Sequence, residues 1–348
     1  MKNATYYAHD AYDYLSELPG FLSSLLNVST FMGHEPKDRE RLSAIWRNLA
    51  VVQENRSRLA QNPGVLNALH ALASSPLNED EGFTTRNVIN TLISLSMDAE
   101  SSLILLMHGD GIFSNLMQGL LACSDDTVRK RAARTVRLWA SHETSGALLV
   151  HFSALMDRVS AVALRDTCEE VHHEAAEAFG RCAGWVQGGH PNFDTVLDAL
   201  ASLCCSSSPN VVARALKGQA AHPKNRLLLI ERPIFLETLI TITLEPNNPL
   251  LAREDACCAI ADLAAEKKNR QRMATPELFE ALCANTSAPN RREHTVKALV
   301  YLTHEEENIP KMVHFPSLLQ SLIQYAATAE NAIKGPVKHA ILLLVTKI

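Results

Sequence analysis

The feature of this sequence that most constrains its fold is a helical pattern that recurs about every 42 residues. Apolar residues spaced i, i+3, i+4 and i+7 mark eight similar segments, at 39–51, 85–97, 129–141, 173–185, 211–221, 254–266, 293–305 and 336–348. Aligning the segments places Asn48, Ser94, Leu138, Arg181, Gly218, Asp262, Tyr301 and Leu343 in one column, with successive spacings of 46, 44, 43, 37, 44, 39 and 42 residues. Because one such unit cannot bury its apolar face alone, the pattern predicts a stacked repeat array.

Each of these main segments is preceded by a second amphipathic segment, at 19–28, 63–75, 111–123, 153–165, 192–205, 232–244, 275–287 and 315–327. Helix-start signals fit these positions, since Thr275-Pro276-Glu277 offers a capping oxygen, a first-turn proline and an acid. A shorter third segment often follows the main one, at 54–64, 224–233, 267–276 and 307–316. We therefore expect three helices per unit and an all-α protein.

The three-helix unit resembles the armadillo repeat. The short segments resemble the armadillo pattern in which Asn and an Ile or Leu turn lead through a Gly or Pro corner into the next helix, and AIWRNLAV (44–51) resembles that family's motif ending in Asn-Leu-Ala. Other units, notably VRKRAARTV (128–136), look equally like HEAT repeats. The resemblance implies a right-handed α-solenoid superhelix of about eight armadillo-like repeats over 19–348, preceded by an N-terminal segment or cap at 1–18.

The fourth unit departs from the pattern. Its spacing to the next unit is only 37 residues, and Gly188, Gly189 and Pro191 stand where the short helix should be. This predicts a loop or kink. Three tryptophans, Trp46, Trp139 and Trp185, occupy apolar helix positions and are expected in the core. A tyrosine cluster near the N-terminus is expected either to cap the core or to engage a partner, and consists of Tyr6, Tyr7, Tyr12 and Tyr14.

Composition narrows the functional classes. Hydrophobic residues make up 47% and aromatic residues 5%, so the core must consist mainly of aliphatic side chains. A net charge of -5 gives no overall attraction to nucleic acid or anionic membranes, and neither a signal peptide nor a long apolar span is evident. The adjacent pairs Cys204-Cys205 and Cys257-Cys258 are expected to be reduced and buried. We expect a cytoplasmic protein, which could also enter the nucleus, without a membrane partner.

One motif keeps an enzymatic interpretation open. HHEAAEAFG (172–180) contains His173-Glu174, which resembles the His-Glu element of deoxyhypusine hydroxylase, a di-iron enzyme built from HEAT repeats. Such a site needs several ligands, whereas the other His-Glu pairs fall outside the equivalent helix position. The alternative is that His173 and Glu177 form an exposed pair one helical turn apart. No catalytic residue, cofactor or metal is therefore expected, with a metal-dependent HEAT-type enzyme as the alternative.

The main helices carry the candidate binding surface. In armadillo proteins such as the importins and beta-catenin, the resemblance implies that an Asn in the aligned column and a Trp four residues earlier face a concave groove and clamp an extended peptide. Here only Asn48 retains the Asn, and the earlier column contains no Trp. Basic residues occur instead, since Lys130, Arg134 and Arg137 share one helix face and later units place further cations on the same face. These could equally be ordinary solvated positions.

We therefore predict a non-enzymatic scaffold or adaptor that binds a protein, as an extended and possibly acidic segment, along the groove. Nucleic-acid binding through the basic stripe is a further alternative, disfavoured by the negative net charge and the lack of interleaved aromatics. The apolar run from Ile341 to Val345 predicts self-association or a partner at the C-terminal helix, unless the preceding helix covers it. The predicted groove residues are Asn48, Asn90, Lys130, Arg134, Arg137, Arg181, Arg214, Lys217, Lys297 and Tyr301.

Overall fold

The protein is helical throughout the part of the chain that the computed structural model describes, with no strand in it. The described residues are 20–32, 35–74, 82–186, 188, 190–191, 193–206, 208–286, 288–328 and 334–346. The tyrosine cluster of the expected N-terminal cap lies outside them. The chain divides into two compact units, Met1–Cys182 and Ala183–Ile348.

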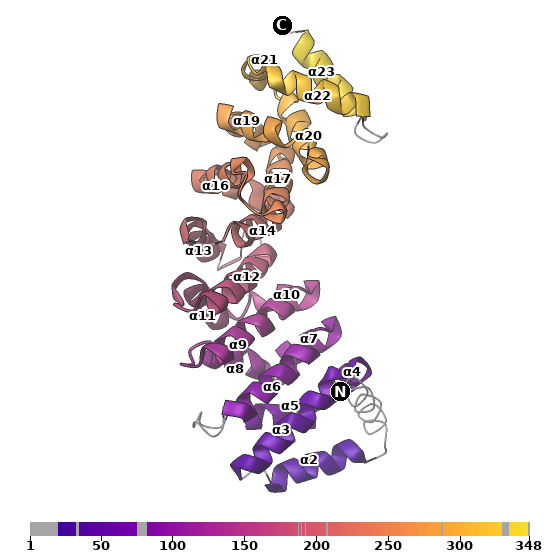
Figure 1. Ribbon diagram of the computed structural model, residues 1–348, viewed down its shortest axis with the longest axis vertical. Coiled ribbons are helices and arrows are strands. Elements are labelled where there is room, and N and C mark those ends of the chain that lie inside the picture. Colours follow the sequence, from indigo (N-terminus) through magenta and orange to yellow (C-terminus); the bar gives the residue numbers. More distant parts are fainter. Residues whose placement is uncertain are drawn as a thin grey trace. The chain divides into compact units, whose positions relative to one another are not determined.

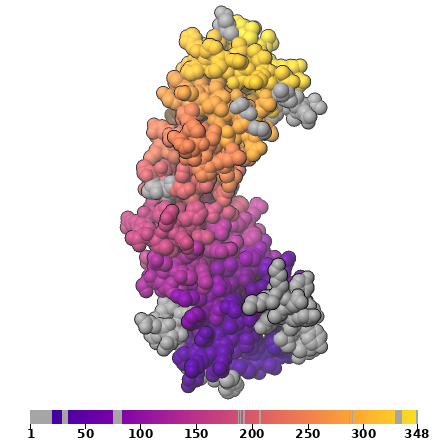
Figure 2. All heavy atoms as spheres, viewed as in Figure 1, coloured from indigo at the N-terminus to yellow at the C-terminus, as the bar shows by residue number. Residues whose placement is uncertain are grey.

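The helices of the first unit form three layers, and within each layer equivalent helices of successive repeats stack side by side (Figure 1). The main layer contains α3 (Pro36–Val51), α6 (Gly82–Leu95), α9 (Asp126–Trp139) and the greater part of α12 (Glu169–Trp185). The second contains α2 (Phe21–Met32), α5 (Pro63–Ala73), α8 (Ile112–Leu120) and α11 (Ser153–Arg165). The third contains α4 (Gln53–Ala60), α7 (Ala99–Met107) and α10 (Glu143–Leu149), and a 3-10 turn, η2 (His108–Asp110), links α7 to α8. Each helix packs on its counterpart in the next repeat, so successive repeats appear as adjoining bands of colour within this unit (Figure 2).

The second unit repeats the same arrangement. Its main layer contains α14 (Pro209–Ala221), α17 (Leu250–Ala265), α20 (Pro289–Thr303) and α23 (Lys334–Val345). The second layer contains α13 (Phe193–Ser206), α16 (Pro233–Leu244), α19 (Pro276–Asn285) and α22 (Pro316–Thr328). The short helices are α15 (Pro223–Ile230), η3 with α18 (Lys267–Asn269, Arg270–Met273) and η4 with α21 (Glu306–Asn308, Ile309–Val313).

The repeat pattern located these helices correctly. Each predicted main segment overlaps one main-layer helix, and each predicted preceding segment overlaps one second-layer helix. Trp46 and Trp139 are fully buried, as expected, whereas Trp185 is only half-buried. The two cysteine pairs differ from expectation: Cys257 is buried, but Cys258 is half-buried and Cys205 is exposed. Its partner in sequence, Cys204, is half-buried on the same helix.

The predicted interruption follows α12. Val186 and Gly188 lie in no helix, and Gly189 is outside the described residues. Side chains of the following repeat hold the described part of this loop: Asn225 accepts a 2.7 Å hydrogen bond from the Gly188 N–H and donates a 3.0 Å bond to the Val186 carbonyl. Gln219 donates to the same carbonyl at 3.3 Å. Two side-chain amides therefore satisfy the backbone where the short helix is missing.

The helix backbones approach closely just before this loop. A Cβ atom added to Gly218 of α14 would lie 3.1 Å from the Cα atom of Gly184. A larger side chain at either position would force the helices apart, so glycine in the aligned column is explained by packing rather than by a turn.

The carboxyl ends of the main helices are capped by side chains from the short helices. Such a helix end leaves backbone carbonyls without partners. In three repeats an asparagine of the short helix reaches back six residues to a backbone carbonyl at the end of the main helix, with Asn55 on Leu49 at 3.2 Å, Asn269 on Leu263 at 3.1 Å and Asn308 on Leu302 at 3.1 Å. In a fourth repeat the equivalent Asn225 donates instead to the side chain of Gln219 at 3.0 Å. Serines take the same place in two others, with Ser102 on Ser96 at 3.1 Å and Ser145 on Trp139 at 2.6 Å.

The residue after the asparagine extends the cap. Arg56, Arg226 and Arg270 donate from Nε to the carbonyls of Ala50, Ala220 and Ala264 at 3.2, 2.8 and 3.1 Å. The asparagines also join neighbouring repeats, because Asn269 and Asn308 donate to the carbonyls of Arg226 and Arg270 at 2.9 and 3.1 Å. The Asn269-Arg270 dipeptide thus both ends a main helix and ties one repeat to the next.

The described residues contain no single helix long and apolar enough to cross a membrane. One bent pair, α10 with α11, meets the length and composition requirement together, but its two helices turn through 94° at the break between them.

The capping role of asparagine can be tested at Asn269, which is 1% exposed and donates to two carbonyls. We expect Asn269→Ala to lower the free energy of unfolding by about 2 kcal/mol, because both carbonyls lose their partner in a buried setting. Urea unfolding followed by circular dichroism measures this. The neighbouring exposed Lys268→Ala serves as control and should change stability by less than about 0.5 kcal/mol. Equal losses for the two variants would contradict the capping role.

Candidate functional site

In the first unit, carboxylates of α12 neutralise much of the predicted basic stripe. Lys130 forms an ion pair with Glu170. Arg137 Nε lies 2.8 Å from Glu174 Oε2 and 3.4 Å from Glu177 Oε2. Arg181 lies 3.7 Å from Glu177, one turn away on the same helix, and donates a 2.8 Å hydrogen bond to the Ser141 hydroxyl. Each of these cations therefore already has a partner within the protein.

In the second unit, two predicted cations share one buried carboxylate. Lys217 Nζ and Arg214 Nε lie 2.7 and 3.6 Å from Asp255, which is 3% exposed. Burial alone would lower the pKa of Lys217, but the hydrogen bond and charge of Asp255 raise it above its usual value. Arg214 and Lys217 therefore have a structural role, which is to neutralise the buried carboxylate of the next main helix.

The last two predicted groove residues are also engaged. Lys297 pairs with Glu293 of its own helix at 2.6 Å. Tyr301 is half-buried, and the guanidinium carbon of Arg270 lies 5.7 Å from its ring centroid. An arginine at that distance from an aromatic face makes a favourable cation–π contact.

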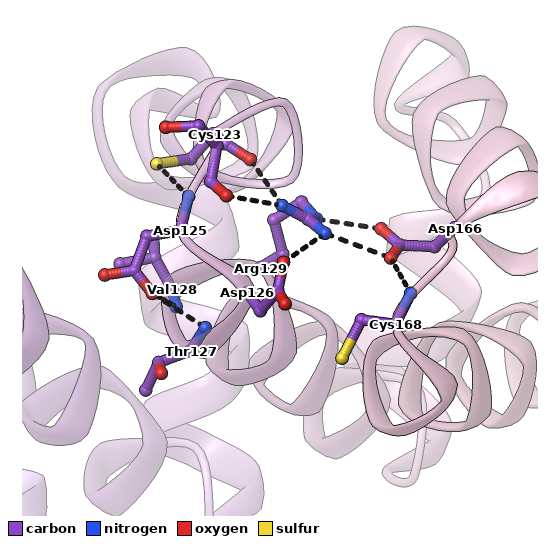
Figure 3. Close-up of polar contacts among 9 residues, drawn as sticks. Cys123, Asp125, Asp126, Thr127, Val128, Arg129, Asp166 and Cys168 are labelled. Atoms are coloured by element: carbon purple, nitrogen blue, oxygen red, sulfur yellow. Dashed lines mark hydrogen bonds and ion pairs between the residues drawn. The ribbon is translucent and has the colours of Figure 1, made fainter.

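The ion pairs that join described residues of neighbouring repeats in the first unit share one order: the cation belongs to the earlier repeat and the carboxylate to the later one. Arg86 pairs with Asp125 at 2.6 Å, and Arg129 with Asp166 at 2.8 Å. Figure 3 shows that Arg129 is saturated, because it also donates to Asp126 and to the carbonyls of Cys123 and Ser124. A guanidinium with this many partners fixes the junction of two repeats and is not available to a ligand.

A different group of polar side chains, on α3, α6 and α9, combines asparagines with arginines that form no ion pair with the described residues. We call it the amide–arginine patch; it consists of Arg47, Asn48, Asn87, Asn90, Arg131 and Arg134. Arg47 donates 2.9 and 3.1 Å hydrogen bonds to the side-chain oxygens of Asn87 and Asn48, so amides and not carboxylates hold it. Asn90 and Arg134 occupy equivalent positions on adjacent packed helices. Three of the predicted groove residues, Asn48, Asn90 and Arg134, belong to this patch.

Two arginines of the patch have no partner among the described residues. Neither the half-buried Arg131 nor the exposed Arg134 forms a hydrogen bond or ion pair through its guanidinium there. Burial, together with the positive charges of Arg86 and Arg47, lowers the pKa of Arg131. Two neighbouring positive charges, which the charge of Asp125 offsets only in part, make the surroundings of this half-buried guanidinium a favourable place for an anion.

The patch can therefore recognise two features of a ligand at once. Guanidinium groups bind carboxylate or phosphate oxygens through paired hydrogen bonds. The side-chain amide of Asn90, without a hydrogen-bond partner among the described residues, can both donate to and accept from a peptide group.

The side chains of the possible metal-binding motif, His173-Glu174 with Glu177, do not converge on one point. His173 is exposed, whereas the carboxylates of Glu174 and Glu177 face Arg137 in the ion pairs described above. Within the described ranges, no three His, Cys, Asp or Glu side chains are grouped so that they could hold a metal ion.

No protein-family model and no curated protein matches this chain. Among solved structures, an engineered protein from the Northeast Structural Genomics Consortium has a TM-score of 0.72 at 16% identity, over 97% of this chain and 84% of that one. A computationally designed armadillo repeat protein for modular peptide recognition has a TM-score of 0.55 at 21% identity, over 68% of this chain and 99% of that one. This chain has an armadillo-like repeat fold. At these identities the likeness is one of fold alone.

Sequence reasoning missed two residues of the armadillo-like main layer that matter here, Arg47 and Arg131. Arg47 directly precedes the predicted groove residue Asn48, and Arg131 directly follows Lys130. The available signal was the composition of the helix between them, because α6 contains no acidic residue that could pair with either arginine. Counting the acids of α6, and not only the cations along the stripe, would have moved the expected site toward the first three repeats.

The junction drawn in Figure 3 gives a pH-dependent prediction. Burial alone would raise the pKa of Asp166, but hydrogen bonds from Arg129 and the Cys168 N–H, and the charge of Arg129, lower it below its usual value. Asp166→Asn should therefore cost about 3 kcal/mol of unfolding free energy near neutral pH, because Arg129 keeps its charge without its main partner. The stabilisation by Asp166 is complete above the pKa of the unfolded chain and is lost as pH falls through the lower folded pKa.

Urea unfolding of native protein and variant at several pH values checks this. The difference in stability should shrink below about pH 4. Asp126→Asn is the matched control, since Asp126 also contacts Arg129 but its side chain is 60% exposed. A difference between native protein and Asp166→Asn that stays constant down to strongly acidic pH would show that the pair does not stabilise the junction.

Proposed function

We propose that this armadillo-like protein is a non-enzymatic scaffold that binds an extended, acidic segment of a partner protein on its main-helix layer, through the amide–arginine patch. The observation that carries the proposal is the contrast within the first unit. Arg129 and Arg137 are matched by carboxylates of the protein, whereas Arg131 and Arg134 have none among the described residues. A partner carboxylate would supply the missing counter-charge.

The position of the patch supports an extended ligand. Its residues come from three successive main helices, so contacts recur at the spacing of packed helices rather than converging on one point. An extended chain presents backbone groups along its length to side-chain amides such as that of Asn90, and acidic side chains to the arginines between them. The designed armadillo repeat protein similar in fold is a peptide-recognition protein, which makes the same use of this layer reasonable.

Binding of a short fluorescein-labelled peptide of alternating glutamate and serine, followed by fluorescence anisotropy, tests the proposal. Arg131→Gln with Arg134→Gln should weaken binding about tenfold or more, because two charge-assisted hydrogen-bonding groups are lost. The thermal midpoint should stay the same or rise slightly, since neither guanidinium has a protein partner to lose. Binding by the native protein should also weaken as salt concentration rises.

The matched control removes two arginines from another layer of the same unit. Arg158 and Arg165 are exposed on α11, so Arg158→Gln with Arg165→Gln makes the same change in net charge away from the patch. Equal weakening by the two double variants would reduce the effect to net charge and overturn the proposal. A single-stranded oligonucleotide of equal charge that binds more tightly than the peptide, and loses the same affinity on mutation of the patch, would show a nucleic-acid site instead.

Self-association is a second proposal, favoured by the surface of α23. Val337, Ala340 and Leu344 of this helix are buried, and Ile341 and Leu343 are half-buried, but Leu342 and Val345 are 59% and 50% exposed. Beside them an apolar groove of about 440 Å³ is lined by residues that include Met312, Leu319 and Ile323. Burying this surface against a second copy of the chain would remove exposed apolar area.

Static light scattering over a concentration series tests this second proposal. The mean mass of the native chain should rise with concentration, and Leu342→Glu with Val345→Glu should abolish the rise. Leu250→Glu with Leu251→Glu is the matched control, because these two apolar side chains of α17 are 56% and 47% exposed. A native chain that stays monomeric over the whole series would refute self-association.

A further inference from the structure

The second unit contains a buried arginine that forms no ion pair with any residue that the structure describes. Arg291, the third residue of α20, is 6% exposed, and its Nε and Nη1 atoms are buried without a hydrogen-bond partner. Arg253, the fourth residue of the adjacent helix α17, has a buried Nε in the same condition, while its Nη1 donates a 3.3 Å hydrogen bond to the Pro246 carbonyl. A protein rarely leaves a buried guanidinium without a partner, because the lost hydration is not replaced.

The charges around Arg291 do not balance it. Burial lowers its pKa, and the positive charge of Arg253 lowers it further. Glu254 is close enough to oppose this effect in part, but it forms no ion pair with either arginine. The two arginines, on helices that pack against each other, therefore repel electrostatically, and Cys257 and Glu254 compensate this repulsion only in part.

The backbone adds positive potential at the same place. The first turns of α17 and α20 contain no acidic residue, and neither N-cap residue, Pro249 or Ala288, provides a side-chain hydrogen bond to the free N–H groups. Some other helices have such a cap, for example Asp125 on α9 and Thr275 on α19, and others, such as α14 and α16, do not. Uncapped helix N-termini carry partial positive charge and free donors, which is the arrangement that attracts oxyanions.

We propose that Arg253 and Arg291, at the amino ends of α17 and α20, form a binding site for a doubly charged oxyanion of the phosphate type. Phosphate carries between one and two negative charges near neutral pH and offers several acceptor oxygens, so one group can neutralise both guanidiniums and accept their unpaired N–H donors. A carboxylate would neutralise only one. Because the donor atoms are covered, binding requires the Arg291 side chain to turn toward the ligand.

This site is independent of the amide–arginine patch, since it lies in the other compact unit and shares no residue with it. The phosphate could be free in solution or carried on a phosphorylated side chain, and both supply the same chemistry to the arginines. Failure of the peptide-binding proposal therefore leaves this one standing.

The test uses the full chain and inorganic phosphate, with sodium chloride adjusted to keep ionic strength constant. The thermal midpoint of the native protein should rise with phosphate concentration, because a ligand that binds only the folded state stabilises it. Arg291→Met should remove this dependence. In phosphate-free buffer the same variant should melt at the native temperature or above it, because replacing an unpaired buried charge with an apolar side chain of similar length relieves a cost.

Arg272→Met is the matched control, because Arg272 is an exposed arginine of the same unit, on α18. It should keep the native response to phosphate. A response of Arg291→Met equal to the native one would reveal a general salt effect and overturn the proposal, and so would no response of the native protein. A lower midpoint for Arg291→Met without phosphate would also overturn it, since the guanidinium would then have adequate protein partners.

Calorimetric titration separates the two sources. A phosphoserine peptide that binds at least tenfold more tightly than inorganic phosphate, while its unphosphorylated form does not bind, identifies a phosphorylated partner. Equal or tighter binding of inorganic phosphate identifies a free anion. Both results support the oxyanion site, and Arg253→Met should weaken either ligand.

Discussion

The structure depends on how each main helix ends. A long helix leaves several carbonyls unpaired at its carboxyl terminus, and in a stacked repeat this end cannot simply face water. Here an asparagine in three repeats, or a serine in two others, reaches back six residues to close the helix, and the arginine that follows Asn55 and Asn269 extends the cap. Because Asn269 also bonds to the preceding short helix, the same side chain sets the spacing of neighbouring repeats. Layers of otherwise ordinary aliphatic helices are thereby held in register.

Much of the architecture could be predicted because helical periodicity depends only on which residues are apolar. The column through Asn48, Ser94 and Leu138 located the main helices, and the glycines near residue 188 marked the missing short helix. What could not be predicted was which side chains replace that helix. Asn225 and Gln219 lie more than thirty residues away from the loop that they hold. Such contacts follow from stacking and leave no local pattern.

The candidate site shows the limit of counting charges along one helix face. Lys130, Arg137 and Lys217 carry the charge that the pattern indicated, but the next main helix supplies Glu170, Glu174 and Asp255 at matching positions. Arg131 and Arg134 differ, because no carboxylate among the described residues forms an ion pair with either of them. Availability of a cation is thus a property of two adjacent repeats, which an inspection of one repeat at a time does not reveal.

The one-way order of these ion pairs has a consequence for modularity. In the first unit Arg86, Arg129 and Arg137 each reach forward to an acid of the following repeat, so one side of a repeat is cationic and the other anionic where they meet. A repeat turned end to end would therefore meet its neighbour with a face of the same sign. This part of the array thus has an electrostatic direction, which is encoded by the cation of each pair preceding its acid along the chain.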